Sequence, residues 1–508
     1  MKTKIYNSFL FFSTTIYTSL CLSQSPSMSW HNLYGGSGLE QFSCLDFTTD
    51  DGYILGGYAT SSNGDVSENQ GNEDYWIVKV DAEGTLLWEK SYGGSSLDVV
   101  RKIKQTSDGG YIVAGATESN DGDVSGYHAQ RDAWVIKLDA SGNMIWQQCL
   151  GGELTEDPCG IIQTSDGGYM VMSVSSSHTG DPSNPTMTSD FWLVKLDASG
   201  TILWDKSIDN NGNNDYPFDM KQTSDGGYIV VGWTDDGSGY DNWIVKLDPL
   251  GNVEWEKVHG GSQDEIPTGV DQTIDGGFVV AGRTSSNDGD VEGFHGEIDL
   301  WVLKLDLSGN LLWTNALGGS HNEWAWAICH TAEGGCVAIG LTNSTDGDVS
   351  GFPGQGAAWL VNLDASGNLI DEVPIGGSIG EEGRAIRQKS NGEFIFAGAS
   401  MSSDGEFSDN HGGIDAWLVN LGPFTSSGLE EFSSTVEAFP NPVKDKLIVS
   451  VEESAIGEKY FLVDDMGRIV MDGKVSSDNV EINMFFVAPG TYHLKINDQI
   501  VKEKIIKV

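Results

Sequence analysis

Basic residues are scarce in this sequence. Only 28 of its 508 residues are Lys or Arg, against 74 Asp and Glu, which gives a formal net charge of -46. Proteins that bind nucleic acid or anionic lipid surfaces rely on clusters of Lys and Arg to neutralise phosphate. The composition therefore argues against a nucleic-acid partner and favours either a solvated acidic surface or the binding of cationic partners.

Cysteines are also few, and they match no zinc-binding pattern, because paired Cys-x-x-Cys and His-x-x-x-His ligands are absent. One of the six, Cys21, lies near the N-terminus, which leaves an odd set of five that includes Cys44. The other four form two close pairs, Cys149 with Cys159 and Cys329 with Cys336. In an oxidising exterior these pairs are candidate disulfides, and buried free thiols are the alternative.

Apolar runs long enough to span a bilayer are also missing, so no transmembrane segment is expected. The longest apolar stretch follows Lys2 and Lys4 and ends at Leu20, before small and polar residues. This pattern is typical of a secretory signal peptide, and we expect residues 1–23 to be removed. Cys21 is a poor lipid-attachment site, because the bulky Leu20 precedes it.

A long tandem repeat dominates the rest of the chain. A segment of the form Trp-Ile-Val-Lys-Leu-Asp occurs seven times, and its tryptophans are separated by 58, 58, 51, 58, 58 and 58 residues. Each unit contains four candidate strands divided by turns of Gly, Asp, Asn and Ser. The first turn is usually Asp-Gly-Gly, as at residues 108–110, where glycine supplies the positive φ of a tight hairpin. The repeated tryptophans are Trp76, Trp134, Trp192, Trp243, Trp301, Trp359 and Trp417.

Seven units of four antiparallel strands predict an all-β, seven-bladed β-propeller over residues 30–421. An open solenoid is the alternative, and the ends of the repeat favour the ring. The last unit stops after Leu421 without a fourth strand, whereas residues 30–37 read like the fourth strand of the other units. The N-terminal strand should therefore complete the final blade and remove the exposed edges of an open array. The strand order loosely resembles WD-repeat and quinoprotein propellers, but no charged constellation typical of a quinone site is found.

A different module follows the repeat. Residues 422–436 read as a linker, and residues 437–508 contain short strands with Lys and Glu on the polar face. The segments Phe439–Pro442, Asp465–Val470 and Pro489–Ile496 resemble, in the same order, the type A sorting domain of type IX secretion in Bacteroidetes. The motif residues that carry this resemblance are Pro440, Asn441, Pro442, Gly467, Gly490 and Tyr492.

The resemblance implies that residues 437–508 form a small Ig-like β-sandwich recognised by the type IX secretion machinery. It further implies export through the inner membrane, folding in the periplasm and transfer across the outer membrane. Proteins of this class are released or held at the cell surface, and the sequence leaves that choice open. An ordinary Ig-like accessory domain is the alternative interpretation.

Repeated acids mark one face of the predicted ring. The longest loops, between the second and third strands, carry an Asp-Gly-Asp core, and a further acid stands two residues before most of the tryptophans. Such carboxylates are candidate calcium ligands. Alternatively, Asp-Gly forms a turn and the second acid caps a backbone amide. In the fourth unit this loop, Thr234–Asp241, is seven residues shorter, which predicts a notch. The calcium candidates are Asp121, Asp123, Asp132, Asp288, Asp290 and Asp299.

No catalytic constellation emerges from the remaining residues. The histidines follow no metal-binding spacing, and the carboxylates are too numerous to nominate an acid and a base. Trp324 and Trp326 are candidate platforms for sugars or blade-packing residues. The sequence favours a noncatalytic binding or adhesion module for a glycan or protein, with a secreted polysaccharide hydrolase or lyase as the alternative. Non-repeated acids, His and Arg gathered at the channel mouth would favour the enzyme.

Overall fold

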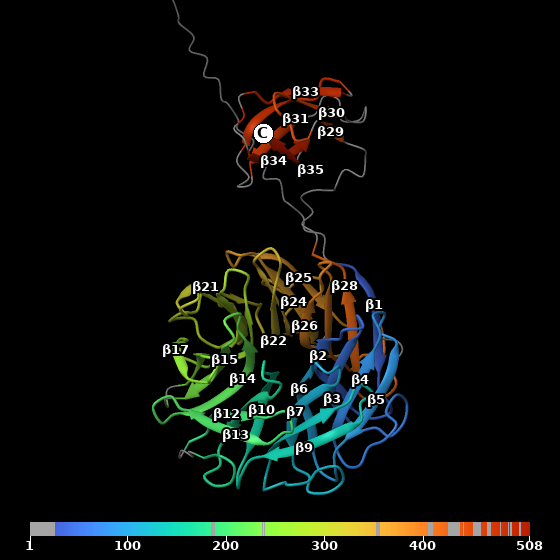
Figure 1. Ribbon diagram of the computed structural model, residues 1–508, viewed down its shortest axis with the longest axis vertical. Coiled ribbons are helices and arrows are strands. Elements are labelled where there is room, and N and C mark those ends of the chain that lie inside the picture. The colour runs from blue at the N-terminus through green and yellow to red at the C-terminus, as the bar shows by residue number, and fades with distance from the viewer. Residues whose placement is uncertain are drawn as a thin grey trace, which may run out of the picture. The chain divides into compact units, whose positions relative to one another are not determined.

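The computed structural model contains two compact units, one of residues Ser25–Phe424 and a smaller one within Thr425–Val508 (Figure 1). Every regular element among the described residues is a β-strand. The described residues contain no helix long and apolar enough to cross a membrane. The described residues are 26–183, 188–235, 237, 239–351, 356–404, 410–424, 437–439, 441–450, 459–464, 469–477, 479–485, 487, 490–496 and 499–507.

The N-terminal unit is built from four-stranded antiparallel sheets, seven of them in its described part, numbered here in chain order. The first three sheets are β2 (Glu40–Phe47), β3 (Tyr53–Ala59), β4 (Asp74–Val80) and β5 (Leu86–Tyr92); β6 (Asp98–Gln105), β7 (Tyr111–Thr117), β8 (Asp132–Leu138) and β9 (Met144–Leu150); and β10 (Glu156–Gln163), β11 (Tyr169–Ser175), β12 (Asp190–Leu196) and β13 (Ile202–Ile208).

The next three sheets are β14 (Asn214–Gln222), β15 (Tyr228–Asp235), β16 (Tyr240–Leu247) and β17 (Val253–His259); β18 (Glu265–Gln272), β19 (Phe278–Thr284), β20 (Asp299–Leu305) and β21 (Leu311–Leu317); and β22 (Glu323–His330), β23 (Cys336–Thr342), β24 (Ala357–Leu363) and β25 (Leu369–Ile375). The seventh combines β26 (Glu381–Gln388), β27 (Phe394–Ser400) and β28 (Asp415–Leu421) with the N-terminal β1 (Met28–Tyr34). In its register Leu33 lies opposite Trp417, so the N-terminal strand takes the outer position that the other sheets fill with their fourth strand.

The repeated tryptophans hold neighbouring sheets together. Each is fully buried and lies in a hydrophobic cluster shared by two sheets: Trp134, for example, packs with Ile54 and Ile77 of the first sheet. Tyr75 lies 4.6 Å from Trp134 between ring centroids and donates its hydroxyl to the Trp134 carbonyl at 2.9 Å. Truncating such a residue to Ala costs roughly 3–5 kcal/mol, so the repeat period follows from interfaces between sheets.

In the first five sheets a lysine three residues after the repeated tryptophan supports the turn between the first two strands. Lys137 is buried, and its Nζ lies 3.0 Å from the Asp108 carboxylate and donates to the Leu138 carbonyl at 2.9 Å. The same pairing recurs in the first five sheets. In the seventh, Asn420 replaces this lysine, and Lys389 of the turn reaches its side-chain oxygen at 2.8 Å. The cation has moved from strand to turn while its contact is kept.

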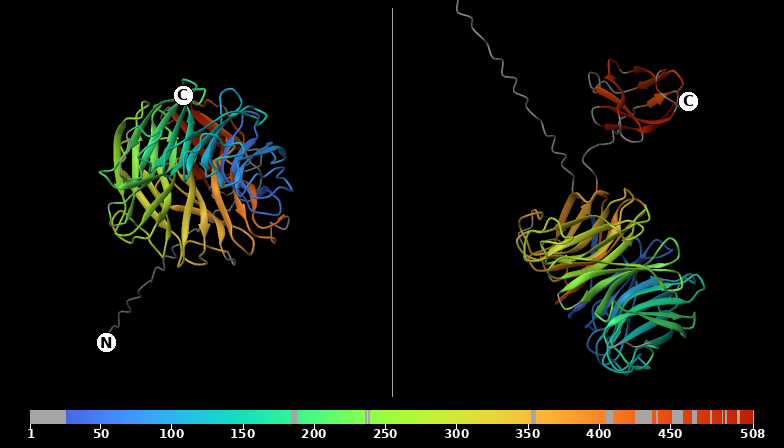
Figure 2. Two further views of the ribbon diagram at one scale, coloured as in Figure 1. Left: turned by 90° about the horizontal axis from the view of Figure 1, so that it is seen from below. Right: turned by 90° about the vertical axis from the view of Figure 1, so that its left-hand side faces the viewer.

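Successive sheets contact one another through their first strands, β2, β6, β10, β14, β18, β22 and β26, and β26 in turn contacts β2. Figure 1 shows first strands toward the middle of the unit and last strands such as β5, β9 and β17 at its rim, and Figure 2 shows the sheets side by side from two other directions. Repeated four-stranded antiparallel sheets arranged in this way are consistent with a β-propeller.

The C-terminal unit has two sheets. One contains β29 (Glu437–Phe439), β30 (Lys446–Ser450) and β33 (Asn479–Asn483), and the other contains β32 (Ile469–Lys474), β31 (Lys459–Asp464), β34 (Gly490–Ile496) and β35 (Gln499–Lys507). Side chains of both sheets, including Leu447 and Leu494, form one core. Tyr492 belongs to that core, Gly490 opens β34, and the Asn441 side chain accepts the Ile506 amide at 2.8 Å. Pro440, Gly467, the predicted signal peptide and residues 425–436 lie outside the described residues.

All five cysteines of the N-terminal unit are buried and unpaired. Neither close pair, Cys149 with Cys159 or Cys329 with Cys336, forms a disulfide, so the second of the two interpretations left open by the sequence applies. Burial raises the pKa of the Cys336 thiol to about 12, which keeps it protonated and unreactive.

Candidate functional site

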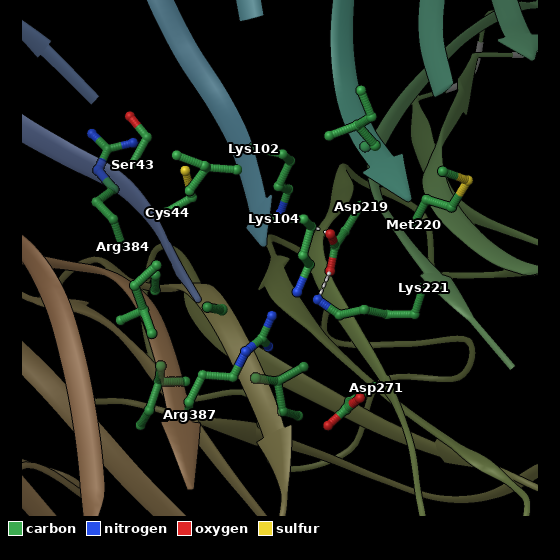
Figure 3. Close-up of a pocket in the computed structure, with 18 of the residues that line it drawn as sticks. Ser43, Cys44, Lys102, Lys104, Asp219, Met220, Lys221, Asp271, Arg384 and Arg387 are labelled. Carbon is green, nitrogen blue, oxygen red and sulfur yellow. Dashed lines mark ion pairs between the residues drawn. The ribbon is translucent and has the colours of Figure 1, made fainter. Parts of the chain in front are cut away.

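The first strands of all seven sheets line a cavity of about 320 Å³ (Figure 3). Side chains of a strand alternate between its two faces, so residues at one repeat position meet at the centre of the unit. Lys104, Lys221 and Arg387 occupy the same repeat position, two residues before the first residue of the turn that joins the first two strands. The cavity therefore opens nearer these turns than the long loops, which lie at the opposite ends of the strands.

This cavity collects cations in a unit that has few. Between residues 30 and 421 the sequence has 17 Lys and Arg against 60 Asp and Glu, and five of the 17 are the repeated lysines that support turns. Six more line this cavity or the one that adjoins it, so half of the remaining twelve gather at the centre of the unit. These six are Arg101, Lys102, Lys104, Lys221, Arg384 and Arg387.

Asp219 anchors two of the lysines. Its buried carboxylate lies 2.8 Å from Lys102 Nζ and 3.2 Å from Lys221 Nζ, and it accepts the Val270 amide at 3.2 Å. Burial alone would raise the pKa of Asp219, but the two ammonium groups outweigh that effect and hold it well below its usual range. Asp219 is therefore a fixed anion that positions Lys102 and Lys221.

Three cationic groups point toward the same part of the cavity from β6, β14 and β26, as Figure 3 shows for Lys104, Lys221 and Arg387. Burial lowers the pKa of Lys221 to about 8, and repulsion from Arg387 and Lys102 adds to this, against the attraction of Asp219. Burial and Arg387 likewise lower the pKa of Lys104, although Lys104 Nζ lies 2.9 Å from Asp46. These lysines are held close together at an electrostatic cost.

His330 forms a second polar pair beside this cluster. Its Nδ1 lies 2.7 Å from the Asp271 carboxylate, which also accepts the His330 amide at 3.0 Å. The Asp271 contact raises the pKa of His330. Burial raises the pKa of Asp271, but His330 and Lys221 overcome this and lower it. Asp271 is thus ionised and His330 favours its charged form.

An adjoining cavity of about 190 Å³ shares Ser43, Lys102, Trp326 and Arg384 with the first. Its charges are matched: Arg101 forms a two-point contact with Asp157, Nε to Oδ1 at 3.0 Å and Nη2 to Oδ2 at 2.9 Å. The Arg384 guanidinium lies 3.9 Å from the centroid of the Trp326 ring. Trp326 is half-buried beneath this cation, so the ring is not the open sugar platform that the sequence suggested as one alternative.

The predicted calcium ligands of the long loops contact backbone and side-chain groups near the preceding inter-sheet connection. Asp121 accepts the Ser95 amide at 2.7 Å, and Asp123 accepts the Gln70 side-chain amide at 2.6 Å. Asp288 similarly accepts the Ser262 amide at 2.8 Å, while Asp290 lies 2.9 Å from His259 Nδ1. These contacts are those of the turn-forming alternative, and calcium at these acids stays a prediction.

The remaining two predicted ligands, Asp132 and Asp299, are fully buried one connection further along. Asp132 accepts the His128 amide at 2.9 Å and meets His128 Nδ1 at 2.8 Å, and Asp299 accepts the His295 amide at 2.7 Å. A side chain added at Gly151 would touch both Asp132 and Glu156. The structure therefore places Asp132 at the interface after the one that holds Asp121 and Asp123.

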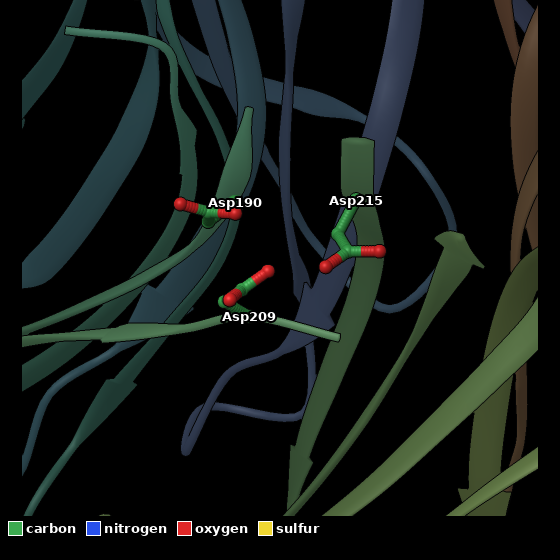
Figure 4. A group of neighbouring side chains, drawn as sticks. All are labelled: Asp190, Asp209 and Asp215. Carbon is green, nitrogen blue, oxygen red and sulfur yellow. The ribbon is translucent and has the colours of Figure 1, made fainter. Parts of the chain in front are cut away.

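One inter-sheet connection departs from the repeat. Gly93, between the first two sheets, has no room for a Cβ, which would meet Asp74 at 2.5 Å and Asp98 at 2.7 Å. At the equivalent position between the third and fourth sheets stands Asp209. Its carboxylate forms a close group with the buried pair Asp190 and Asp215, all within 4.8 Å (Figure 4). Burial, together with Asp209, raises the pKa of Asp190 to about 7 and that of Asp215 to about 6. The shortened fourth-sheet loop lies at this same connection.

Comparison with known families identifies the smaller unit. A family model described as a secretion system C-terminal sorting domain matches residues 437–508. The C-terminal unit is a type IX secretion sorting domain. It directs the protein through the periplasm to the cell surface or beyond, and it engages the type IX secretion machinery.

No curated protein matches the chain. Solved structures similar to it include PorZ, a surface component of the type IX secretion system of Porphyromonas gingivalis, at 11% identity and a TM-score of 0.41, over 94% of this chain and 60% of PorZ. A puromycin hydrolase is 13% identical at a TM-score of 0.45, over 81% of this chain and 58% of its own. Sqt1 of Chaetomium thermophilum is 9% identical at a TM-score of 0.41, over 77% of this chain and 98% of its own. This chain thus spans about 60% of the length of the first two, and similarity at this level carries no argument about function.

The cationic cluster was not predicted from the sequence, although a signal for it exists. At the position of Lys104 the seven repeats differ in charge, whereas the residue just before it is always apolar. In a repeat this regular, a position whose charge varies while its neighbours stay constant indicates side chains that are not constrained by packing between sheets. The seven residues at that position are Asp46, Lys104, Ile162, Lys221, Asp271, Cys329 and Arg387.

Proposed function

We propose that this chain is an exported binding protein of the bacterial cell surface. In this proposal residues 30–421 form a closed seven-bladed β-propeller, residues 1–23 act as the signal peptide, and the sorting domain is an Ig-like sandwich. The pairing of β1 with β28 and the contact between β26 and β2 support closure. Two sheets around one core support the sandwich.

The non-repeated cations of the central cavity carry the proposal of binding. Packing explains the repeated residues, but it gives no reason for Lys104, Lys221 and Arg387 to differ from their counterparts. Side chains from several sheets converge there on a concave space, as ligand sites commonly require. The protein is therefore proposed to hold a glycan or protein ligand through this cavity, and calcium at the long loops remains a separate proposal.

The state of the carboxylates favours binding over hydrolysis. A polysaccharide hydrolase needs one carboxylic acid whose pKa is raised so that it can protonate the leaving oxygen. In the cavity Asp219 and Asp271 have lowered pKa values, because cations surround them. Neither acid holds a proton at neutral pH, so the pair that hydrolysis requires is not formed by these residues.

A lyase is the second candidate, and one observation favours it. The cavity combines two acids and Arg387 with Lys221, and the non-repeated His330 pairs with one of those acids, Asp271. The pKa of Lys221, about 8, suits a general base near neutral pH. Elimination from an acidic sugar needs such a base and a cation beside the sugar carboxylate. Turnover of acidic polysaccharides that disappears in Lys221→Met but persists in Lys257→Met would establish this function in place of simple binding.

The binding proposal is tested with the chain lacking residues 1–23, on a glycan array and by thermal shift. Specific glycans should be retained on the array. Substitutions in the cavity should weaken glycan binding, whereas Asp121→Asn in a long loop should leave it unchanged. Retention that depends on Asp121 and not on Arg387 would move the site to the loops. A second arm adds calcium or chelator, and an unchanged melting temperature in both would end the calcium proposal.

A further inference from the structure

The balance of charge around the central cavity is the reverse of that of the whole protein. Five cationic side chains and two carboxylates line it, which leaves a formal charge of +3 at a site inside a strongly acidic unit. The lining cations are Lys102, Lys104, Lys221, Arg384 and Arg387.

The acids near this cluster are already engaged. Asp219 is shared by Lys102 and Lys221, Asp271 pairs with His330, and Asp46 accepts from Lys104 Nζ and from the Gln105 amide. Among the residues that the structure describes, no carboxylate pairs with Arg387. A guanidinium stays charged at any physiological pH, so Arg387 leaves an uncompensated cation facing the cavity.

In the adjoining cavity, arginines with a structural role are paired with carboxylates. Arg101 grips Asp157 with two nitrogens, and Arg384 lies 2.8 Å from Glu382 through Nε while covering Trp326. Both arginines have a carboxylate within reach. Arg387 has no such carboxylate partner among the described residues, so it differs from these structural ion pairs and is available to bind an anion.

Holding three cations together when only Lys104 and Lys221 have a partner carboxylate costs stability. Desolvation and mutual repulsion penalise the charged forms of Lys104 and Lys221, whose pKa values are both lowered. A bound anion would offset this cost, because it supplies the missing charge and accepts hydrogen bonds from the ammonium and guanidinium groups. Nothing in the packing of the seven sheets requires these cations, since other repeats place Ile162 or Cys329 at the same position.

We propose that the cavity binds a sulfate or phosphate group, which Lys104, Lys221 and Arg387 hold from three sides. The proposal rests on the binding function proposed above and names the chemistry of its ligand. A sulfate or phosphate group, free or attached to a sugar, offers at least three terminal oxygens and therefore suits three donors better than a carboxylate, which offers two. The volume of about 320 Å³ exceeds that of the free ion, so the group can enter while attached to a sugar.

Isothermal titration of the chain lacking residues 1–23 tests this assignment, with inorganic sulfate, a sulfated monosaccharide and glucuronate as probes at constant ionic strength. Sulfate should bind, and Arg387→Met and Lys221→Met should each weaken it at least tenfold. Arg283→Met and Lys257→Met are matched controls that change the same residue types outside the cavity, and both should bind as the parent does. Arg387→Lys keeps the charge but loses the planar fork, so an intermediate loss is expected.

The outcomes separate the ligand chemistry from the binding function. Tighter binding of the sulfated sugar than of inorganic sulfate identifies a substituted glycan as the source, and equal binding identifies the free ion. The assignment is overturned if sulfate does not bind, if glucuronate binds more tightly, or if Arg387→Met and Arg387→Lys both bind as the parent does. Glycan retention that survives in Arg387→Met would keep the proposed binding function while rejecting the oxyanion site.

Discussion

Replacing Asp219 by Asn should destabilise the N-terminal unit and at the same time make it responsive to anions. The Asp219 carboxylate is the shared counterion of Lys102 at 2.8 Å and Lys221 at 3.2 Å. Asparagine keeps the size of the side chain but removes its charge. Two half-buried ammonium groups then face Lys104 and Arg387 with no fixed anion between them.

The size of the effect follows from burial. Removing one partner of a buried ion pair costs about 3–5 kcal/mol. The Asp219 side chain is 5% exposed, but those of Lys102 and Lys221 are 30% and 20% exposed, so water relieves part of the cost and about 3 kcal/mol is expected. An unfolding entropy of about 2.1 cal/mol/K per residue over residues 25–424 converts this into a fall in Tm of about 4 °C.

Differential scanning calorimetry with and without sulfate measures both effects. Asp275→Asn is the matched control, because Asp275 pairs with Lys304 at 2.9 Å but its side chain is 59% exposed. The Lys304 side chain is buried, but without Asp275 its Nζ still donates to the Thr273 hydroxyl and the Leu305 carbonyl, so this substitution should cost less than Asp219→Asn. Sulfate should restore more Tm to Asp219→Asn than to either the parent or the control. A loss no greater than in Asp275→Asn, or no added response to sulfate, would refute the electrostatic reasoning.

Three further outcomes are expected. Titrations should show weaker sulfate binding as the pH rises through about 8. Sulfate keeps its charge between pH 6 and pH 9, whereas Lys221, which lies among groups of β2, β6, β14, β18, β22 and β26, loses its proton near pH 8. Binding independent of pH would argue against Lys221 as a donor. Asp209→Gly, which restores the repeat, should raise Tm by about 1–2 °C at pH 8 and by less at pH 5. The reason is that the raised pKa values of Asp190 and Asp215 make the folded unit lose stability as pH rises from about 4 to 7. An equal gain at both pH values would show that repulsion is not the cause. A chain that starts at Gly35 lacks β1 and leaves the β28 edge unpaired, so size-exclusion chromatography should detect self-association, and a stable monomer with unchanged Tm would contradict ring closure by β1.

The repeat allowed the four-stranded sheets to be predicted from the sequence, since each strand needs the same apolar pattern to pack against its neighbours. Tryptophan spacing gave the unit length, and Asp-Gly-Gly gave the first turn. The resemblance at residues 437–508 is confirmed by the match to a sorting domain. The seven-bladed closed ring, the Ig-like form and calcium remain predictions or proposals.

The central cavity was missed because its residues are neither a motif nor neighbours in sequence. Lys104, Lys221 and Arg387 are separated by more than a hundred residues and meet only because their strands share one centre. The overall acidity also directed attention to cations as partners. Comparing the repeats position by position would have shown where charge varies, but the geometry was needed to show that three of these positions face one another.

Anomalous diffraction from crystals grown with selenate tests the central claim most directly, because selenate matches sulfate in shape and charge and its selenium can be located independently of a model. The account predicts one strong peak in the cavity, within hydrogen-bonding reach of Lys104, Lys221 and Arg387 through its oxygens. The peak should vanish in crystals of Arg387→Met. A cavity without selenium in the parent protein, or selenium bound only at the outer surface, would contradict the claim.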